Sequence, residues 1–146
     1  MAIVLPKFSR HRSPNGSATE AQPAVNLSLC SDDGVYQVGS PLTAKWRISR
    51  VPLDEVHSLE ASVLWYTEGK GDEDLHVHHF HRLADDQVRR AGLADEQSTH
   101  CSLPATPLSY QGQLISVRWG VRVRIFLTDG REIVAEQPFH LVSQSS

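Results

Sequence analysis

The clearest pattern in the chain is an alternation of apolar and polar positions in residues 113–127. Every odd position from Ile115 to Leu127 is apolar, and the even positions are mostly arginine, serine or glycine. A period of two is typical of a strand with one buried face, because successive side chains of a strand point to opposite sides of the sheet. A helix would scatter the same apolar groups around its circumference. We therefore expect one long strand, and because it exceeds the usual strand length we expect a bend at Gly120.

The partner of this strand is expected in residues 131–142, across the loop Thr128-Asp129-Gly130. A two-residue turn would pair Val123 with Glu136 and place that carboxylate on the core face. A three-residue loop, closed by Gly130 in the left-handed region, pairs apolar residues with apolar residues: Ile125 with Ile133, Val123 with Ala135, Trp119 with Phe139, and Val117 with Leu141. Arg122 then meets Glu136 on the outer face, as a cross-strand ion pair.

Between these strands and residue 24 the chain alternates short strand patterns with turns that contain glycine, proline or aspartate. The strand patterns cover residues 25–30, 35–38, 42–49, 59–67, 75–83 and 97–103. Only residues 85–96 suggest a helix, and Gly92 weakens that pattern. About seven or eight strands at this spacing predict an all-β fold, an antiparallel β-sandwich that covers residues 24–142.

The two ends of the chain lack such patterns. Residues 1–23 are predicted to form a flexible N-terminal tail, and residues 143–146 a short C-terminal tail. The apolar run near Met1 is too short for the core of a signal peptide, so we expect a cytoplasmic protein. No apolar run approaches the roughly 20 residues that a membrane-spanning helix needs.

Composition narrows the function only coarsely. The chain has 146 residues, of which 40% are hydrophobic and 21% charged, and this describes one ordinary globular domain. A formal net charge of -3 gives no reason to expect a nucleic acid as partner. The two cysteines, Cys30 and Cys101, fall in predicted strands and are expected to be buried free thiols. A bridge between them would require that their strands adjoin.

Two short motifs resemble the arrestin-like superfamily. The first is Leu103-Pro104-Ala105-Thr106-Pro107-Leu108-Ser109-Tyr110-Gln111-Gly112, which leads into the alternating strand that contains Trp119. The second is Tyr36-x-x-Gly39-x-Pro41, with Ser40 at the position where the family usually has glutamate. The resemblance covers about residues 24–142. It implies a single immunoglobulin-like, arrestin-like β-sandwich, similar to bacterial members of the sporulation-control type rather than to the two-sandwich eukaryotic members.

The resemblance also carries an expectation about function. Arrestin-like proteins are characteristically non-enzymatic adaptors and scaffolds that bind proteins through loops and exposed strand edges. It implies a protein partner here, bound through a strand edge or through a loop such as Glu68–Asp74. From the residues themselves we expect Tyr110 to be structural, with a buried ring and a hydroxyl bonded to nearby backbone.

The segment after that loop is the sharpest candidate for a metal site. His76, His78, His79 and His81 alternate with Val77 and Phe80, just after an acidic loop. Histidines at i and i+2 of a strand share a face and can bind Zn²⁺ or Cu²⁺. An ideal strand sends the two histidine pairs to opposite faces, so a site with four ligands would need a β-bulge. The alternative is that these are partly exposed strand histidines that titrate near pH 6.5 and bind no cofactor.

Arg118, Arg122 and Arg124 line the outer face of the long strand, where Lys45 or Arg47 could join them. Such a row could bind an acidic peptide, a phosphate or a nucleic acid, or it could be a solvated sheet face with glutamate partners. No motif of a serine hydrolase, a phosphate-binding loop or a zinc protease occurs in the sequence. We therefore predict a non-enzymatic protein-binding domain, with metal binding as the alternative.

Overall fold

The computed structural model describes residues 3–6, 24–51, 53–71, 73–90 and 96–144. Within them the chain forms ten strands and two very short helices. The strands are β1 (Ile3–Pro6), β2 (Ala24–Leu29), β3 (Val35–Gln37), β4 (Pro41–Ser49), β5 (Val56–Gly69), β6 (Leu75–Ala84), β7 (Gln97–Ser102), β8 (Tyr110–Gln111), β9 (Ile115–Leu127) and β10 (Glu132–Val142). The helices are η3 (Leu53–Glu55), a 3-10 turn, and α1 (Asp86–Arg90).

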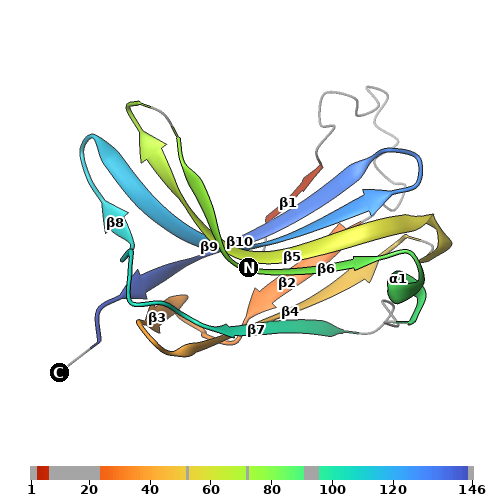
Figure 1. Ribbon diagram of the computed structural model, residues 1–146, viewed down its shortest axis with the longest axis horizontal. Helices are drawn as coiled ribbons and strands as arrows, with labels where there is room; N and C mark the ends of the chain where they lie inside the picture. Colours follow the sequence, from red (N-terminus) through yellow and green to blue (C-terminus); the bar gives the residue numbers. More distant parts are fainter. Residues whose placement is uncertain (1–2, 7–23, 52, 72, 91–95, 145–146) are drawn as a thin grey trace.

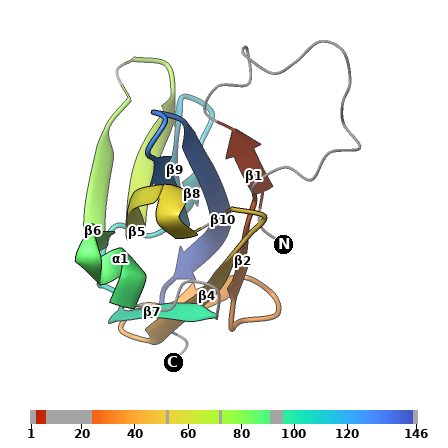
Figure 2. The same ribbon diagram turned by 90° about the vertical axis from the view of Figure 1, so that its right-hand side faces the viewer.

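The strands form two sheets that pack face to face (Figures 1 and 2). The larger sheet has the order β1-β10-β9-β5-β6, with β3 added to β10 and β8 added to β9, and the smaller sheet has the order β2-β4-β7. The predicted all-β sandwich is confirmed. The two strands that were not expected, β1 and β8, have only four and two residues, too few to show a period in the sequence.

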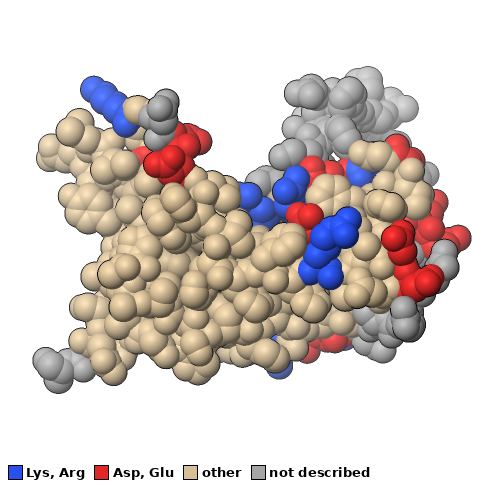
Figure 3. All heavy atoms as spheres, in the orientation of Figure 1, with Lys and Arg blue, Asp and Glu red and all other residues tan. Residues whose placement is uncertain are grey.

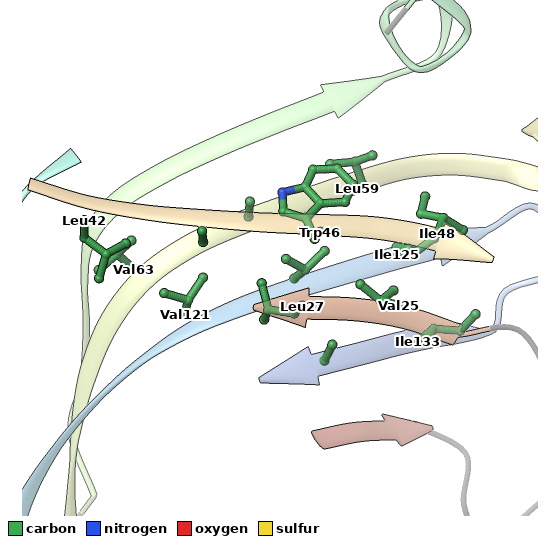
Figure 4. Close-up of a cluster of buried hydrophobic side chains, with 14 of the residues drawn as sticks. Val25, Leu27, Leu42, Trp46, Ile48, Leu59, Val63, Val121, Ile125 and Ile133 are labelled. Atoms are coloured by element: carbon green, nitrogen blue, oxygen red, sulfur yellow. The ribbon is translucent and has the colours of Figure 1, made fainter. Parts of the chain in front are cut away.

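The core lies between the two sheets and is built from alternate residues of the longest strands. Val121, Val123 and Ile125 of β9 are fully buried, as the period of two predicts. Figure 4 shows Trp46 of β4 extending into the same space from the smaller sheet. Burying each such side chain contributes ~1.5–3 kcal/mol, so this cluster is the main source of stability.

The β9–β10 hairpin has the register that side-chain parity predicts. Ile133 pairs with Ile125, Ala135 with Val123, Glu136 with Arg122, Pro138 with Gly120, and Phe139 with Trp119. Gly130 has a φ of 92° and closes the three-residue loop, and the Leu127 amide donates to the Arg131 carbonyl at 2.9 Å. The loop length and the face assignment are both confirmed.

The predicted pair of Val117 with Leu141 is wrong. The ladder between β9 and β10 ends at Trp119 and Phe139, one step beyond Pro138. Proline has no amide hydrogen to donate, so pairing weakens there and β10 leaves β9. Leu141 instead pairs with β3, while Val117 pairs with β8.

Two expectations at the margins of the domain are corrected. Residues 3–6 do not belong to a flexible tail, because β1 pairs antiparallel with β10 from Glu136 to Ile133. The remainder of the predicted tail, residues 7–23, lies outside the described residues. The predicted helix over 85–96 is present as α1, which has five residues, and residues 91–95 also lie outside the described part.

The cysteines differ from the expectation as well. Cys30 follows the last residue of β2 and is exposed, so the predicted burial is wrong for this thiol. Cys101 in β7 is partly buried, and that burial raises the pKa of its thiol. Strand β4 lies between β2 and β7, which keeps the two cysteines apart, and both are free.

Candidate functional site

The three arginines of the long strand lie on the outer face of the larger sheet, and each is paired with a carboxylate. The pairs are Arg118 with Glu68, Arg122 with Glu136 at 2.8 Å, and Arg124 with Glu132 and also, at 3.7 Å, with Glu60. Arg82 adds a pair with Glu60 at 3.7 Å. Four arginines thus face four glutamates, and the face is neutral rather than cationic. This favours a structural role for the row, and partner binding by it stays a prediction.

Lys45 and Arg47 cannot extend this row. They belong to β4 in the smaller sheet, where Ala44, Trp46 and Ile48 point into the core. Their own side chains therefore point outward on the opposite side of the sandwich. The suggestion that they join the arginines of β9 is wrong, because it treated two strands of different sheets as neighbours.

The histidine segment forms β6, and it contains the β-bulge that a shared face requires. Val63 of β5 pairs with His79, and the next residue, Leu64, pairs with Val77. His78 is therefore the extra residue, so the strand changes its parity at this point. Residues opposite the inward-facing positions of β5 lie on the inner face: His76 opposite Trp65, His79 opposite Val63, and His81 opposite Ala61.

His78 also points inward, across the opening between the two sheets. Its Nε2 donates to the carbonyl of Ser102 in β7 at 2.7 Å, and its ring lies 6.0 Å from that of Trp119. His76 stacks on Trp65 with 4.2 Å between ring centroids. The bulge therefore gathers all four imidazoles on the inner side of one edge strand.

Sequence analysis missed a fifth histidine near this cluster, His100 of β7. The pKa of His79 is lowered, first by burial and then by the nearby His78, His81 and His100. No sequence signal joins His100 to the others, because only the packing of β6 beside β7 brings them together. Among the described residues, no group of three or more His, Cys, Asp or Glu side chains is arranged to hold a metal ion. Metal binding by His76, His78, His79 and His81 stays a prediction.

A second exposed feature is the end of the molecule where two hairpin-like tips project side by side (Figure 1). We call this the distal tip and define it as residues 69–71 and 110–115. Ile115 pairs with Gly69, and the Lys70 amide donates to the Leu114 carbonyl at 3.0 Å. Gly69 has a φ of 138°, and a Cβ on it would lie 2.1 Å from the Leu114 oxygen. The close contact between the two loops therefore requires glycine.

The distal tip carries much of the exposed apolar surface in the described residues. Leu114 is 67% exposed, Tyr110 59% and Ile115 42%. Tyr110 and Ile115 belong to the paired strands β8 and β9, and Leu114 lies in the turn between these strands. Apolar side chains that cluster in the open on a rigid support are typical of protein-binding surfaces.

The exposure of Tyr110 overturns its predicted role as a buried corner residue. Its ring lies against Gly112, where a Cβ would come within 2.5 Å of a ring carbon. The buried tyrosine is Tyr36, whose Oη accepts a hydrogen bond from the Ser31 amide at 3.1 Å. Burial raises the pKa of Tyr36. The Ser-Tyr-x-Gly motif thus shapes the distal tip rather than the core.

A surface cavity of about 440 Å³ lies near the turn after β2. Asp32 and Asp33 line it, and Asp33 accepts hydrogen bonds from the Ser31 hydroxyl at 2.7 Å and the Val35 amide at 3.0 Å. These bonds lower the pKa of the Asp33 carboxyl, with the Ser31 bond the larger cause. This carboxylate holds a turn together, and its geometry suggests no catalytic role.

The comparison with solved structures bears directly on the architecture. Spo0M, a sporulation control protein from Bacillus subtilis, superimposes with a TM-score of 0.53 over 82% of this chain, at 11% sequence identity. The fold is arrestin-like. The arrestin-like chain spans about half the length of Spo0M, 49%, so the likeness concerns the domain and not the whole of that protein. No family model matches the sequence, and no curated protein matches it.

The helices of the arrestin-like domain are short. In the part of the chain that the structure describes, η3 has three residues and α1 has five, and neither is long enough to cross a membrane.

Proposed function

We propose that this chain is a non-enzymatic protein-binding domain, an adaptor or scaffold, and that it binds its partner through the distal tip. The observation that carries the proposal is the exposure of three apolar side chains, Tyr110, Leu114 and Ile115, on the β8–β9 hairpin, which backbone pairing fixes. A preorganised surface loses little conformational entropy on binding, so a small apolar cluster suffices as an anchor. The arrestin-like fold supports a regulatory role of this kind.

The chemistry of the distal tip indicates what the partner presents. Leu114 and Ile115 offer aliphatic surface, and Tyr110 offers a ring with a polar hydroxyl, a residue type enriched where binding energy concentrates. Beside them, Arg118 is paired with Glu68 and bonds Gln111 at 3.1 Å, which leaves a satisfied polar rim. A partner with an apolar pocket and few charges fits this surface. A cytoplasmic location belongs to the same proposal, and the free, exposed Cys30 suits a reducing compartment.

A photo-crosslinking amino acid placed at Leu114 tests the proposal in the cells that make the protein. The matched control carries the same group at Thr128, in the exposed turn between β9 and β10. We expect one discrete adduct with a different protein at Leu114 and none at Thr128, and we expect Tyr110→Ser to weaken it. Absence of a heterologous adduct at Leu114, or equal labelling at both positions, would count against the distal tip.

Metal binding by β6 is a second candidate function, because the bulge supplies the shared face that four histidine ligands require. In this arrangement His79 and His81 lie two residues apart on the inner face, and His100 lies across from them on β7. Small side-chain rotations would have to bring them onto one ion. Zinc titration, described in the Discussion, tests this candidate separately.

A further inference from the structure

Among the residues that the structure describes, strand β6 forms an open edge of the larger sheet. It pairs with β5 on one side and ends the strand order β1-β10-β9-β5-β6. Exposed edges usually carry charges or proline, which prevent pairing with another chain. Over its ten residues β6 has no proline and a single charged side chain, Arg82. Leu75, Val77 and Phe80 are each about half exposed, at 49%, 49% and 51%.

The bulge places these apolar residues on one face. Val77 pairs with Leu64, and Phe80 pairs with Ser62, both outward-facing positions of β5. In a regular strand Val77 and Phe80, three residues apart, would point to opposite faces. The extra residue, His78, shifts the alternation of side chains by one position, so that Val77 and Phe80 both point to the outer face.

The result is a strand in which the residues of each face are spaced symmetrically about the middle of the strand. The outer face carries Leu75, Val77, Phe80 and Arg82, and the inner face carries His76, His78, His79 and His81. Both sets are symmetric about the midpoint between His78 and His79. Opposing residues of an antiparallel pair always lie on the same face of the sheet, so such a strand satisfies the condition for pairing with its own copy.

We propose that a second copy of this chain pairs with β6 in antiparallel register, around a two-fold axis between His78 and His79. In this register Val77 opposes Phe80 of the second copy, and Phe80 opposes Val77 of the second copy. Such aromatic and β-branched cross-strand pairs stabilise antiparallel ladders. An interface on a two-fold axis is self-complementary, and the symmetric pattern of β6 provides that complementarity.

The charges around β6 fit the same register. The acidic residues Glu73 and Asp74 precede the strand, and Arg82 lies near its other end. Antiparallel pairing brings the basic end of each strand beside the acidic end of the other. Figure 3, which views the molecule from the side of β6 and β7, shows Lys, Arg, Asp and Glu at the upper left tip and from the upper centre to the right, and a lower left and lower central surface that is largely free of them.

The proposed pairing leaves the distal tip free and goes beyond the proposed function. Strand β6 runs from the distal tip toward α1, so a two-fold axis across β6 places the two tips at opposite ends of the dimer. Such a dimer presents two binding surfaces that face away from each other. It would connect two partner molecules. Where both binding sites belong to one assembly, the binding of one tip would raise the effective concentration of the other tip at its site.

Analytical ultracentrifugation of the full chain at neutral pH, with EDTA to remove metals, tests the proposal. We expect a concentration-dependent dimer that Phe80→Glu converts to a monomer. The matched control, Val35→Glu, changes a similarly exposed apolar residue on β3 and is expected to leave the dimer intact. Circular dichroism verifies that both variants are folded, as their exposure predicts. A chain that is monomeric at all concentrations would overturn the proposal.

Disulfide trapping tests the register itself. In a background without Cys30 and Cys101, a Val77→Cys protein and a Phe80→Cys protein are mixed under oxidising conditions. The register places these two positions opposite each other, within the span that a disulfide bridges, while two copies of Val77→Cys are offset by three residues. We expect the mixed disulfide to exceed either homodimer by much more than the twofold excess that random pairing of equal amounts gives. Yields in the random ratio, or no disulfide at all, would contradict the register, and a dimer without Phe80 dependence would assign the contact to another surface.

Discussion

Replacing Trp119 by alanine is the most direct test of the core. Trp119 is 1% exposed, it pairs with Phe139 across the hairpin, and their ring centroids are 5.7 Å apart. Truncation of a buried tryptophan to alanine typically costs ~3–5 kcal/mol in the free energy of unfolding. The indole Nε1 also donates to the Pro107 carbonyl at 2.7 Å. Loss of that donor leaves the carbonyl without a partner, so we expect a cost in the upper part of this range, ~4–5 kcal/mol.

The assay is urea unfolding followed by circular dichroism, with the free energy extrapolated to water. A domain of this size has ~5–15 kcal/mol in total, so Trp119→Ala removes a large share of it. Trp119→Phe keeps one aromatic ring but loses both the donor and part of the indole volume, so its expected cost lies between the ~1–2 kcal/mol of the donor alone and the cost of the alanine variant. A loss below ~1 kcal/mol for the alanine variant would mean that the side chain is not in the core.

Four further predictions concern single features. Gly69→Ala is expected to cost ~1–3 kcal/mol in the free energy of unfolding, because φ is 138° and the new Cβ would meet the backbone of Leu114. It is also expected to lower the crosslinking yield at the distal tip, and urea unfolding and the crosslinking assay measure the two effects. A double-mutant cycle on Arg122 and Glu136, whose charged groups lie 2.8 Å apart at a partly exposed site, is expected to give at most ~1 kcal/mol. The lowered pKa of His79 favours the neutral imidazole in the folded state. The stabilising contribution of His79 is therefore present above the pKa of the unfolded state, near 6.5, and falls as the pH drops below that value. A stability profile from pH 8 to 5 that rises toward acid would contradict this prediction. If metal binding holds, Zn²⁺ raises the Tm, and changing both His79 and His81 to alanine removes the rise; an unchanged Tm in the original chain ends that candidate.

The sequence is most informative where one face of a strand is buried. In the β9–β10 hairpin, a loop one residue shorter would have put Glu136 in the core. The alternation of apolar and polar side chains was therefore enough to identify the strand register from Ile125 to Trp119. The arrestin-like fold was also expected from the motifs around Tyr36 and Tyr110, and the likeness to Spo0M confirms it.

Prediction fails where a local event resets the pattern. The bulge at His78 has no sequence signal, because His78 and His79 are identical residues and either could be the extra one. Tyr110 belongs to a motif, but its exposure depends on how β8 meets β9, which is a contact between segments. The association of His100 with the histidines of β6 is likewise set by the packing of two sheets.

Strand β10 departs from β9 after Phe139, and this has a consequence for how the protein can change over time. The distal tip is held by the pairing of β5, β8 and β9. Its residues are not part of the hydrophobic core cluster between the two sheets. Substitutions at the exposed residues Lys70, Glu73 and Leu114 therefore leave the interior undisturbed. Descendants of one ancestral gene could acquire new binding preferences there while keeping the same thermal tolerance, and libraries randomised at these positions should yield mostly folded variants.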